Sequence, residues 1–372
     1  MYKKVISVVF CMFLIVAGMG PVYAKTTADA ARLEVENAWK YGKGDGVNVA
    51  LIDCGADLKD PMIRANVKGV YNSLIDSEKE SDVHSAAAEH GTNCAKKILE
   101  AAPSVNLYIV KAGDHNGAYM KDIIAGLYWA KSKNCRVVSY SMGSESFDQK
   151  GYDAIQELFC DSFNSVLVCA SAGNSGIGEH HYPASFDNTL SVGAATYHSS
   201  KNQFVVIPKG TYNNKIDVVA PGAITSHAAP FAAGTAALLF QANPSMTAEE
   251  CRRILRSTAL DLGVKGKDFY YGYGLIQPYA AVKKVLNIDS DSVKKLTLSK
   301  KKLTLYIGQS KKIMCTKVPS KSRGRVYWNS SSPSTVSVTS EGKLTAKRAG
   351  NAVITVKTVN GRKVVCKVNV CR

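Results

Sequence analysis

Val49-Ala50-Leu51-Ile52-Asp53-Cys54-Gly55 is an apolar run that ends in a carboxylate and a glycine. The continuous apolar stretch from Val47 to Ile52 predicts a strand buried on both faces, as in a parallel sheet covered by helices. Asp53 would then stand at the carboxyl end of this strand, where open α/β sheets place their ligand sites. Taken alone, Asp53 is interpreted equally well as a turn residue beside Gly55.

Two further segments carry residues that suit nucleophilic catalysis. His90 stands at the start of a helix-like run, and Ser226 opens a long helix of small residues that ends at Asn243-Pro244. A serine becomes a nucleophile when an imidazole takes its proton and a carboxylate orients that imidazole. Each residue alone also has a simpler interpretation, as a packed histidine or a helix-capping serine.

The order Asp, His, Ser along the chain resembles that of the subtilisin-like serine peptidases, or subtilases. A buried run over residues 166–176 that contains Gly173-Asn174 extends the resemblance, which covers about residues 38–285. It implies a three-layer α/β domain with a parallel sheet and the catalytic residues Asp53, His90 and Ser226. It further implies an oxyanion hole formed by the Asn174 side chain and the Ser226 main-chain N–H. The residues that would contact substrate are Ser141, Met142, Gly143 and Gly173.

The segment before Ser226 departs from the family pattern. Only Ala223 and Ile224 separate Gly222 from Thr225, where subtilases usually carry a longer ribbon. Ile224 also replaces a usual glycine, and a β-branched residue resists conformations that glycine allows. These departures predict an open, unselective leaving-group side of the cleft or a nucleophile held out of position. A catalytically silent peptide-binding or adhesion protein, and a maturation peptidase for one dedicated precursor, therefore stay alternatives to a general endopeptidase.

The chemistry needs no cofactor, and the spacing of His84, His90 and Cys94 fits no zinc pattern, so we predict no metal site. Calcium is frequent in the family, but this sequence places no site for it. Nine of the ten cysteines follow the apolar start of the chain. We interpret Cys54 and Cys94 as packing residues near the Asp and the His. Cys315 and Cys366 could form a bridge in an oxidising compartment.

Residues 1–24 have the features of a secretory signal peptide. Lys3 and Lys4 precede an apolar core, and Val22-Tyr23-Ala24 forms a small-residue cleavage site. The apolar run is too short for a membrane span. We therefore expect a secreted protein, extracellular or associated with the cell wall. It would comprise a peptidase domain (25–287), a linker (288–293) and a C-terminal domain (294–372).

The C-terminal region differs sharply from the rest in charge and pattern. Residues 293–372 contain 19 Lys or Arg and one acidic residue, Glu341, whereas residues 25–292 have a net charge of −3. Short alternating runs separated by turn residues predict a β-sandwich. The segments 328–332 and 342–346 resemble a group 2 bacterial immunoglobulin-like domain, which implies an attachment or spacer module. In a secreted chain the basic surface favours an anionic wall polymer over nucleic acid, although solvated strand faces explain it as well.

Overall fold

The structure is a computed structural model that describes residues 27–114, 117–162, 164–286, 293–320, 322, 326–358 and 362–372. The predicted signal peptide, residues 1–24, lies outside these ranges, as does the predicted linker except for Val293. No helix within the described ranges has the length and apolar character needed to cross a membrane.

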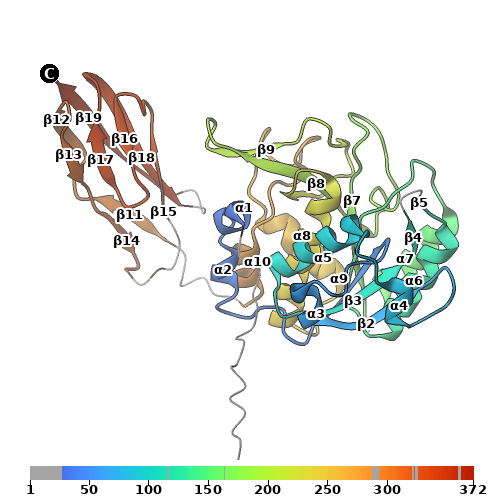
Figure 1. Cartoon of the computed structure of the whole chain (residues 1–372). Coiled ribbons are helices and arrows are strands. Elements are labelled where there is room, and N and C mark those ends of the chain that lie inside the picture. The colour runs from blue at the N-terminus through green and yellow to red at the C-terminus, as the bar shows by residue number, and fades with distance from the viewer. Residues whose placement is uncertain are drawn as a thin grey trace, which may run out of the picture.

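A largely parallel sheet forms the centre of the first region (Figure 1). Its strand order is β10-β8-β7-β6-β1-β3-β2, each neighbouring pair is parallel, and β9 pairs with β8 in the antiparallel sense. The strands are β1 (Asn48–Asp53), β2 (Val67–Asn72), β3 (Asn106–Lys111), β6 (Val137–Tyr140), β7 (Leu167–Ser171), β8 (Thr189–His198), β9 (Gln203–Val206) and β10 (Val218–Pro221). A short hairpin of β4 (Gly113–Asp114) and β5 (Gly117–Ala118) follows β3.

Helices cover both faces of this sheet because its central strands are apolar on both sides. Val49 and Leu51 enter a core that contains α5, α8, α9 and α10, whereas Ala50 and Ile52 enter a second core with α6 and α7. The helices are α1 (Ala28–Arg32), α2 (Val35–Ala38), α3 (Pro61–Asn66), α4 (Glu80–Val83), α5 (Glu89–Ala101), α6 (Met120–Ser132), α7 (Gln149–Cys160), α8 (Thr225–Ala242), α9 (Ala248–Thr258) and α10 (Pro278–Val285). The predicted three-layer α/β architecture is confirmed.

The C-terminal region consists of strands (Figure 1). One sheet has the order β12-β19-β18-β15, a second the order β13-β17-β16, and β11 pairs with β14. Ala352, Ile354 and Val356 alternate into one apolar core, as a strand with a single buried face requires. The strands are β11 (Lys295–Leu298), β12 (Lys302–Tyr306), β13 (Ser310–Lys312), β14 (Cys315–Val318), β15 (Val326–Ser330), β16 (Val336–Val338), β17 (Lys343–Ala346), β18 (Gly350–Thr358) and β19 (Lys363–Cys371). The predicted β-sandwich is confirmed.

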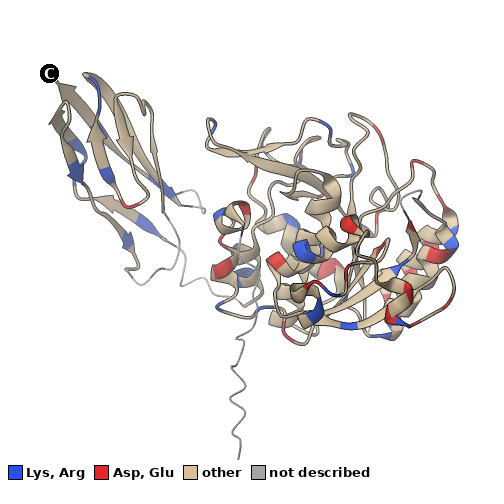
Figure 2. Ribbon diagram, in the orientation of Figure 1, with Lys and Arg blue, Asp and Glu red and all other residues tan. Residues whose placement is uncertain are grey.

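Basic residues follow this division. Figure 2 shows mainly Lys and Arg on the C-terminal strands and a mixture of both signs on the α/β region.

The possible bridge between Cys315 and Cys366 is not formed, because both residues are free thiols.

Candidate active site

His90 and Asp53 form the central pair of the site. Asp53 is the last residue of β1 and is fully buried, and His90 lies in the first turn of α5. His90 Nδ1 lies 2.8 Å from Asp53 Oδ1, which also accepts a hydrogen bond from the Cys54 main-chain N–H at 2.8 Å. A proton on Nδ1, donated to the carboxylate, leaves His90 Nε2 as a base.

Gly91 allows α5 to approach β1 this closely. A Cβ atom at Gly91 would lie 1.9 Å from the carbonyl oxygen of Gly55 and 3.1 Å from Asp53 Oδ1. Gly55 itself has a φ of +91°, a conformation that L side chains rarely adopt. Glycine at these two positions therefore brings the imidazole within hydrogen-bonding distance of the carboxylate.

Ser226 lies at the carboxyl edge of the same sheet, as the second residue of α8, and is buried. Its hydroxyl donates to the main-chain carbonyl of Ser141 at 3.2 Å, and the Ser141 hydroxyl donates to the Ser226 carbonyl at 3.0 Å. No hydrogen bond joins Ser226 to His90 within the described residues. The serine is therefore in the site with its hydroxyl turned toward Ser141.

Ile224, which replaces a usual glycine of the family pattern, lies in unstrained backbone. Its φ and ψ are −141° and 160°, which is ordinary extended backbone. The chain therefore reaches α8 without a conformation for which glycine is needed.

The surroundings of His90 shift the pKa values of two groups in the site. The hydrogen bond to Asp53 raises the pKa of His90, against the opposing effect of burial. Burial raises the pKa of the Cys94 thiol well above its usual value, and the nearby Asp53 charge adds to this. Cys94 Sγ lies 4.0 Å from His90 Nδ1 and donates to the Ser226 carbonyl at 3.2 Å. Cys94 thus contacts both His90 and Ser226.

Asn174 is oriented by the residue that precedes Ser226. Its side-chain Oδ1 accepts hydrogen bonds from the main-chain N–H and the hydroxyl of Thr225, both at 3.2 Å. Because the oxygen is held in this way, the amide NH₂ is left to donate elsewhere. Thr225 was not among the predicted site residues, although its position directly before Ser226 is the signal that could have identified it.

The predicted substrate-contacting residues lie on two neighbouring segments, after β6 and after β7. His181, which was not among the predicted site residues, lies between them. A Cβ atom at Gly173 would be 2.2 Å from His181 Cδ2, and one at Gly143 would be 3.7 Å from His181 Cβ. His181 Nε2 also lies 3.0 Å from the Ser175 hydroxyl. The imidazole therefore fills the space between Gly143 and Gly173.

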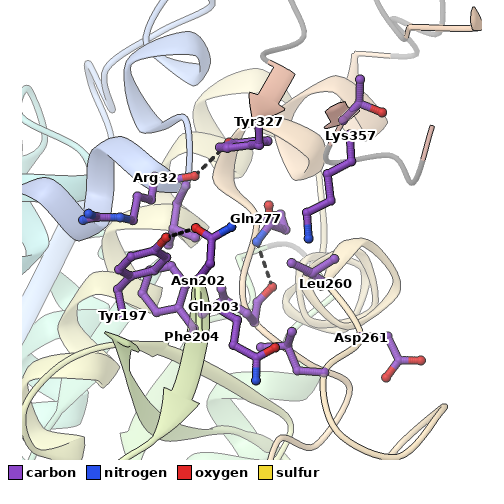
Figure 3. A pocket seen from close by; sticks show the side chains of 14 residues that line it. Arg32, Tyr197, Asn202, Gln203, Phe204, Leu260, Asp261, Gln277, Tyr327 and Lys357 are labelled. Atoms are coloured by element: carbon purple, nitrogen blue, oxygen red, sulfur yellow. Dashed lines mark hydrogen bonds between the residues drawn. The ribbon is translucent and has the colours of Figure 1, made fainter. Parts of the chain in front are cut away.

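Two cavities border other parts of the chain. One, of about 370 Å³, borders His227, the residue after Ser226. The other, of about 390 Å³, lies where Tyr327 donates a hydrogen bond to the Arg32 carbonyl at 3.2 Å (Figure 3). Tyr197, Phe204 and other side chains line this second cavity, but Asp53, His90 and Ser226 do not.

Within the described part of the chain, one group of side chains could hold a metal ion, namely Asp53, His90 and Cys94. Their potential ligand atoms all lie within 4.8 Å of one another. The same atoms hold the imidazole in its present orientation, so a bound ion would compete with the pairing of His90 and Asp53.

Comparison with known sequences gives two family matches. The sequence model of the subtilase family matches residues 44–274, and that of the group 2 bacterial Ig-like domain matches residues 292–368. Minor extracellular protease Epr of Bacillus subtilis is 29% identical over 272 residues, which cover 66% of this chain and 40% of Epr. Subtilisin E of Bacillus subtilis is 33% identical over 268 residues, which cover 64% of this chain and 66% of that protein. The chain thus spans less than two thirds of either relative.

A solved structure described as that of a lanthipeptide protease is also similar. It is 26% identical, has a TM-score of 0.59, and matches over 70% of this chain and 94% of its own. The matched region corresponds in extent to the α/β region.

Proposed function

The chain belongs to the subtilase family of serine peptidases, and on that premise we propose that it is a secreted endopeptidase that uses Asp53, His90 and Ser226. The observation that carries the proposal is the 2.8 Å contact between His90 Nδ1 and the buried carboxylate of Asp53. This contact fixes the imidazole with Nε2 as the base, at the sheet edge that also holds Ser226.

Catalysis begins when the Ser226 hydroxyl turns from the Ser141 carbonyl to His90. His90 Nε2 takes the proton while Ser226 Oγ bonds to the carbonyl carbon of the substrate, and the π electron pair moves onto the carbonyl oxygen. The side-chain amide of Asn174 and the Ser226 main-chain N–H stabilise that oxyanion. His90 then gives its proton to the leaving amine as the C–N bond breaks, and a water molecule releases the acyl group by the same steps.

A fluorophosphonate label and a general protein substrate test this proposal together. We expect the purified protein to be labelled on Ser226 and to cleave casein. Absence of both labelling and cleavage would overturn the proposal and would support a catalytically silent binding protein.

A second candidate function is a maturation peptidase that cuts one dedicated precursor. The short segment between Gly222 and Ser226 and the similarity to the lanthipeptide protease favour it. Labelling of Ser226 without casein cleavage would support this narrower activity.

The group 2 Ig-like domain would attach the enzyme to anionic polymers of the cell wall. Its support is the charge of residues 293–372, 19 basic residues against one acidic residue (Figure 2). Binding by charge weakens as salt shortens the screening length from about 10 Å at 0.1 M to about 3 Å at 1 M. The full protein should therefore sediment with purified wall at low salt and be released at high salt.

A matched pair of variants distinguishes this domain from the rest of the protein. One changes four exposed lysines of the Ig-like domain to Gln, namely Lys295, Lys302, Lys312 and Lys343. The other does the same to four exposed lysines of the α/β region, namely Lys59, Lys79, Lys121 and Lys201. Only the first should reduce wall binding. Equal loss in both, or retention of the unaltered protein at 1 M salt, would contradict attachment through this domain.

A further inference from the structure

The cavity of Figure 3 lies where the Ig-like domain meets the α/β region. Its volume is about 390 Å³, within the range of pockets that bind small molecules. Its walls come from the end of α1, the hairpin of β8 and β9, the segment between α9 and α10, and strands β15 and β18. Neither the proposed catalysis nor the proposed wall attachment uses this cavity.

Two neighbouring side chains bring the Ig-like domain to the cavity. Tyr327 of β15 and Lys357 of β18 are paired across the antiparallel sheet, so their side chains leave the same face. The Tyr327 hydroxyl donates to the Arg32 carbonyl of the α/β region at 3.2 Å. An occupant of the cavity would therefore contact both domains.

The α/β region supplies an apolar wall. Leu33, Phe204 and Leu275 belong to the core beneath the cavity, and Leu262 packs against that core. Leu260 continues the wall and is 38% exposed. A ligand with an apolar body is favoured here because it removes this surface from water.

Most uncharged polar groups around the cavity already have partners within the protein. The Tyr197 hydroxyl donates to Asn202 Oδ1 (Figure 3). The Gln277 amide donates to the main-chain carbonyls of the two residues before it, at 3.3 and 3.1 Å. A peptide would bury main-chain N–H and C=O groups here with few partners, which costs free energy. The polar groups therefore favour a ligand with few hydrogen-bonding groups of its own.

Arg32 is one of three charged residues in the walls, and its charge is engaged. Its guanidinium lies over the Tyr197 ring, 3.9 Å from the ring centroid. It also lies 3.4 Å from Asp29 Oδ1, in an ion pair along α1. Arg32 thus has a carboxylate of its own and needs none from a ligand.

Lys357 is the cation that the cavity leaves without a counter-charge. It forms no ion pair with any residue that the structure describes, and in Figure 3 its amino group is directed toward Leu260. Asp261, the third charged residue, accepts a hydrogen bond from the Gly266 main-chain N–H at 2.9 Å. In the same view its carboxylate points away from Lys357. The cavity therefore combines an apolar wall with one available ammonium group.

We propose that this cavity binds the anion of a medium-chain fatty acid. The carboxylate would lie on the Lys357 ammonium and the alkyl chain against Leu260 and the apolar wall. Because Lys357 belongs to the Ig-like domain and Leu260 to the α/β region, the ligand would hold the two domains together. The inference is independent of the peptidase activity, since none of the proposed catalytic residues lines the cavity.

Isothermal titration calorimetry of the full protein with octanoate tests this proposal. Two comparison ligands separate the two contacts: octanol has the chain without the charge, and butyrate has the charge with a short chain. We expect one octanoate to bind per protein, at least about tenfold more tightly than either comparison ligand, because each of those lacks one contact. No binding of octanoate, or equal affinity for octanoate and either comparison ligand, would overturn the proposal.

Variants on the two sides of the cavity place the ligand. Lys357→Gln should weaken octanoate binding by about tenfold and leave octanol binding unchanged. Its matched control is Lys367→Gln, an exposed lysine of β19 that does not line the cavity, and this variant should bind octanoate as the unaltered protein does.

Leu260→Glu puts a carboxylate into the apolar wall and should abolish octanoate binding. Val264→Glu, four residues further on at a position that is 74% exposed, should not. An octanoate affinity that stays unchanged in Lys357→Gln or in Leu260→Glu would place the fatty acid elsewhere and overturn the inference.

Discussion

Ser226 and Ser141 hold each other through two hydrogen bonds: the Ser226 hydroxyl donates to the Ser141 carbonyl at 3.2 Å, and the Ser141 hydroxyl donates to the Ser226 carbonyl at 3.0 Å. The first bond occupies the proton that His90 would have to take. The second holds the backbone of Ser226 against the Ser141 side chain. The proposed mechanism therefore requires the Ser226 hydroxyl to leave the Ser141 carbonyl before His90 can take its proton.

Removal of the nucleophile gives the first prediction. Ser226→Ala should abolish fluorophosphonate labelling and lower kcat for peptide hydrolysis by about 10⁶-fold, and His90→Ala should have a similar effect. The double variant should be no slower than either single variant, because the two residues act as a unit. Labelling of Ser226→Ala at the rate of the unaltered protein would place the nucleophile elsewhere.

The pH dependence of kcat/KM follows from the shifted pKa of His90. Only neutral His90 can accept the serine proton, and the hydrogen bond to Asp53 stabilises the protonated form, so its pKa lies above the usual value of about 6.5. Activity should therefore decline as the pH falls through a midpoint above 6.5. Asp53→Asn removes the stabilising charge and should move this midpoint to lower pH, with kcat reduced by about 10⁴-fold.

His198→Gln serves as the control for this profile, because His198 is an exposed residue at the end of β8. The midpoint of the pH profile of His198→Gln should equal that of the unaltered enzyme. If the midpoint moves in His198→Gln, or stays unchanged in Asp53→Asn, the loss of activity at low pH belongs to a group other than His90.

Asn174→Ala tests the proposed oxyanion donor. Loss of such a donor should lower kcat by about 10²- to 10³-fold with little change in KM, because the bond forms only in the transition state. Thr225→Val removes one of the two donors that hold Asn174 Oδ1 and should produce a smaller loss of kcat in the same direction. A rise in KM without loss of kcat would show that Asn174 binds the ground state.

Much of the fold could be predicted from local patterns in the sequence. The apolar run before Asp53 identified a central strand of a parallel sheet, because a strand buried on both faces must be apolar throughout. Apolar and polar residues alternate in segments such as Ala352–Val356, and this alternation identified the β-sandwich because each strand there has a single buried face. The motifs around Asp53, His90 and Ser226 also identified three residues that the structure places at one edge of the sheet.

The details of the site depend on contacts between distant segments, which such patterns do not encode. The direction of the Ser226 hydroxyl depends on Ser141, 85 residues earlier in the chain. The packing of His181 against Gly173 depends on how two loops meet.

His181 should limit the residue before the scissile bond to short side chains, because its imidazole fills the space between Gly143 and Gly173. His181→Gly should open that space and raise the ratio of kcat/KM for Phe over Ala at this substrate position by about tenfold or more. His180→Gly, at the neighbouring residue whose ring contacts Ser185, is the matched control and should not change the ratio. An unchanged ratio in His181→Gly would remove His181 from the specificity site.

Cys94 should make the enzyme sensitive to mercury. Its Sγ lies 4.0 Å from His90 Nδ1 and donates to the Ser226 carbonyl, so a metal adduct there would displace both residues. Because burial and the Asp53 charge keep Cys94 protonated, iodoacetamide, which needs a thiolate, should react slowly at pH 7. Mercuric chloride should inhibit peptide hydrolysis by the unaltered enzyme and by Cys54→Ser, whereas Cys94→Ser should resist. Equal inhibition of Cys94→Ser and the unaltered enzyme would show that another thiol is responsible.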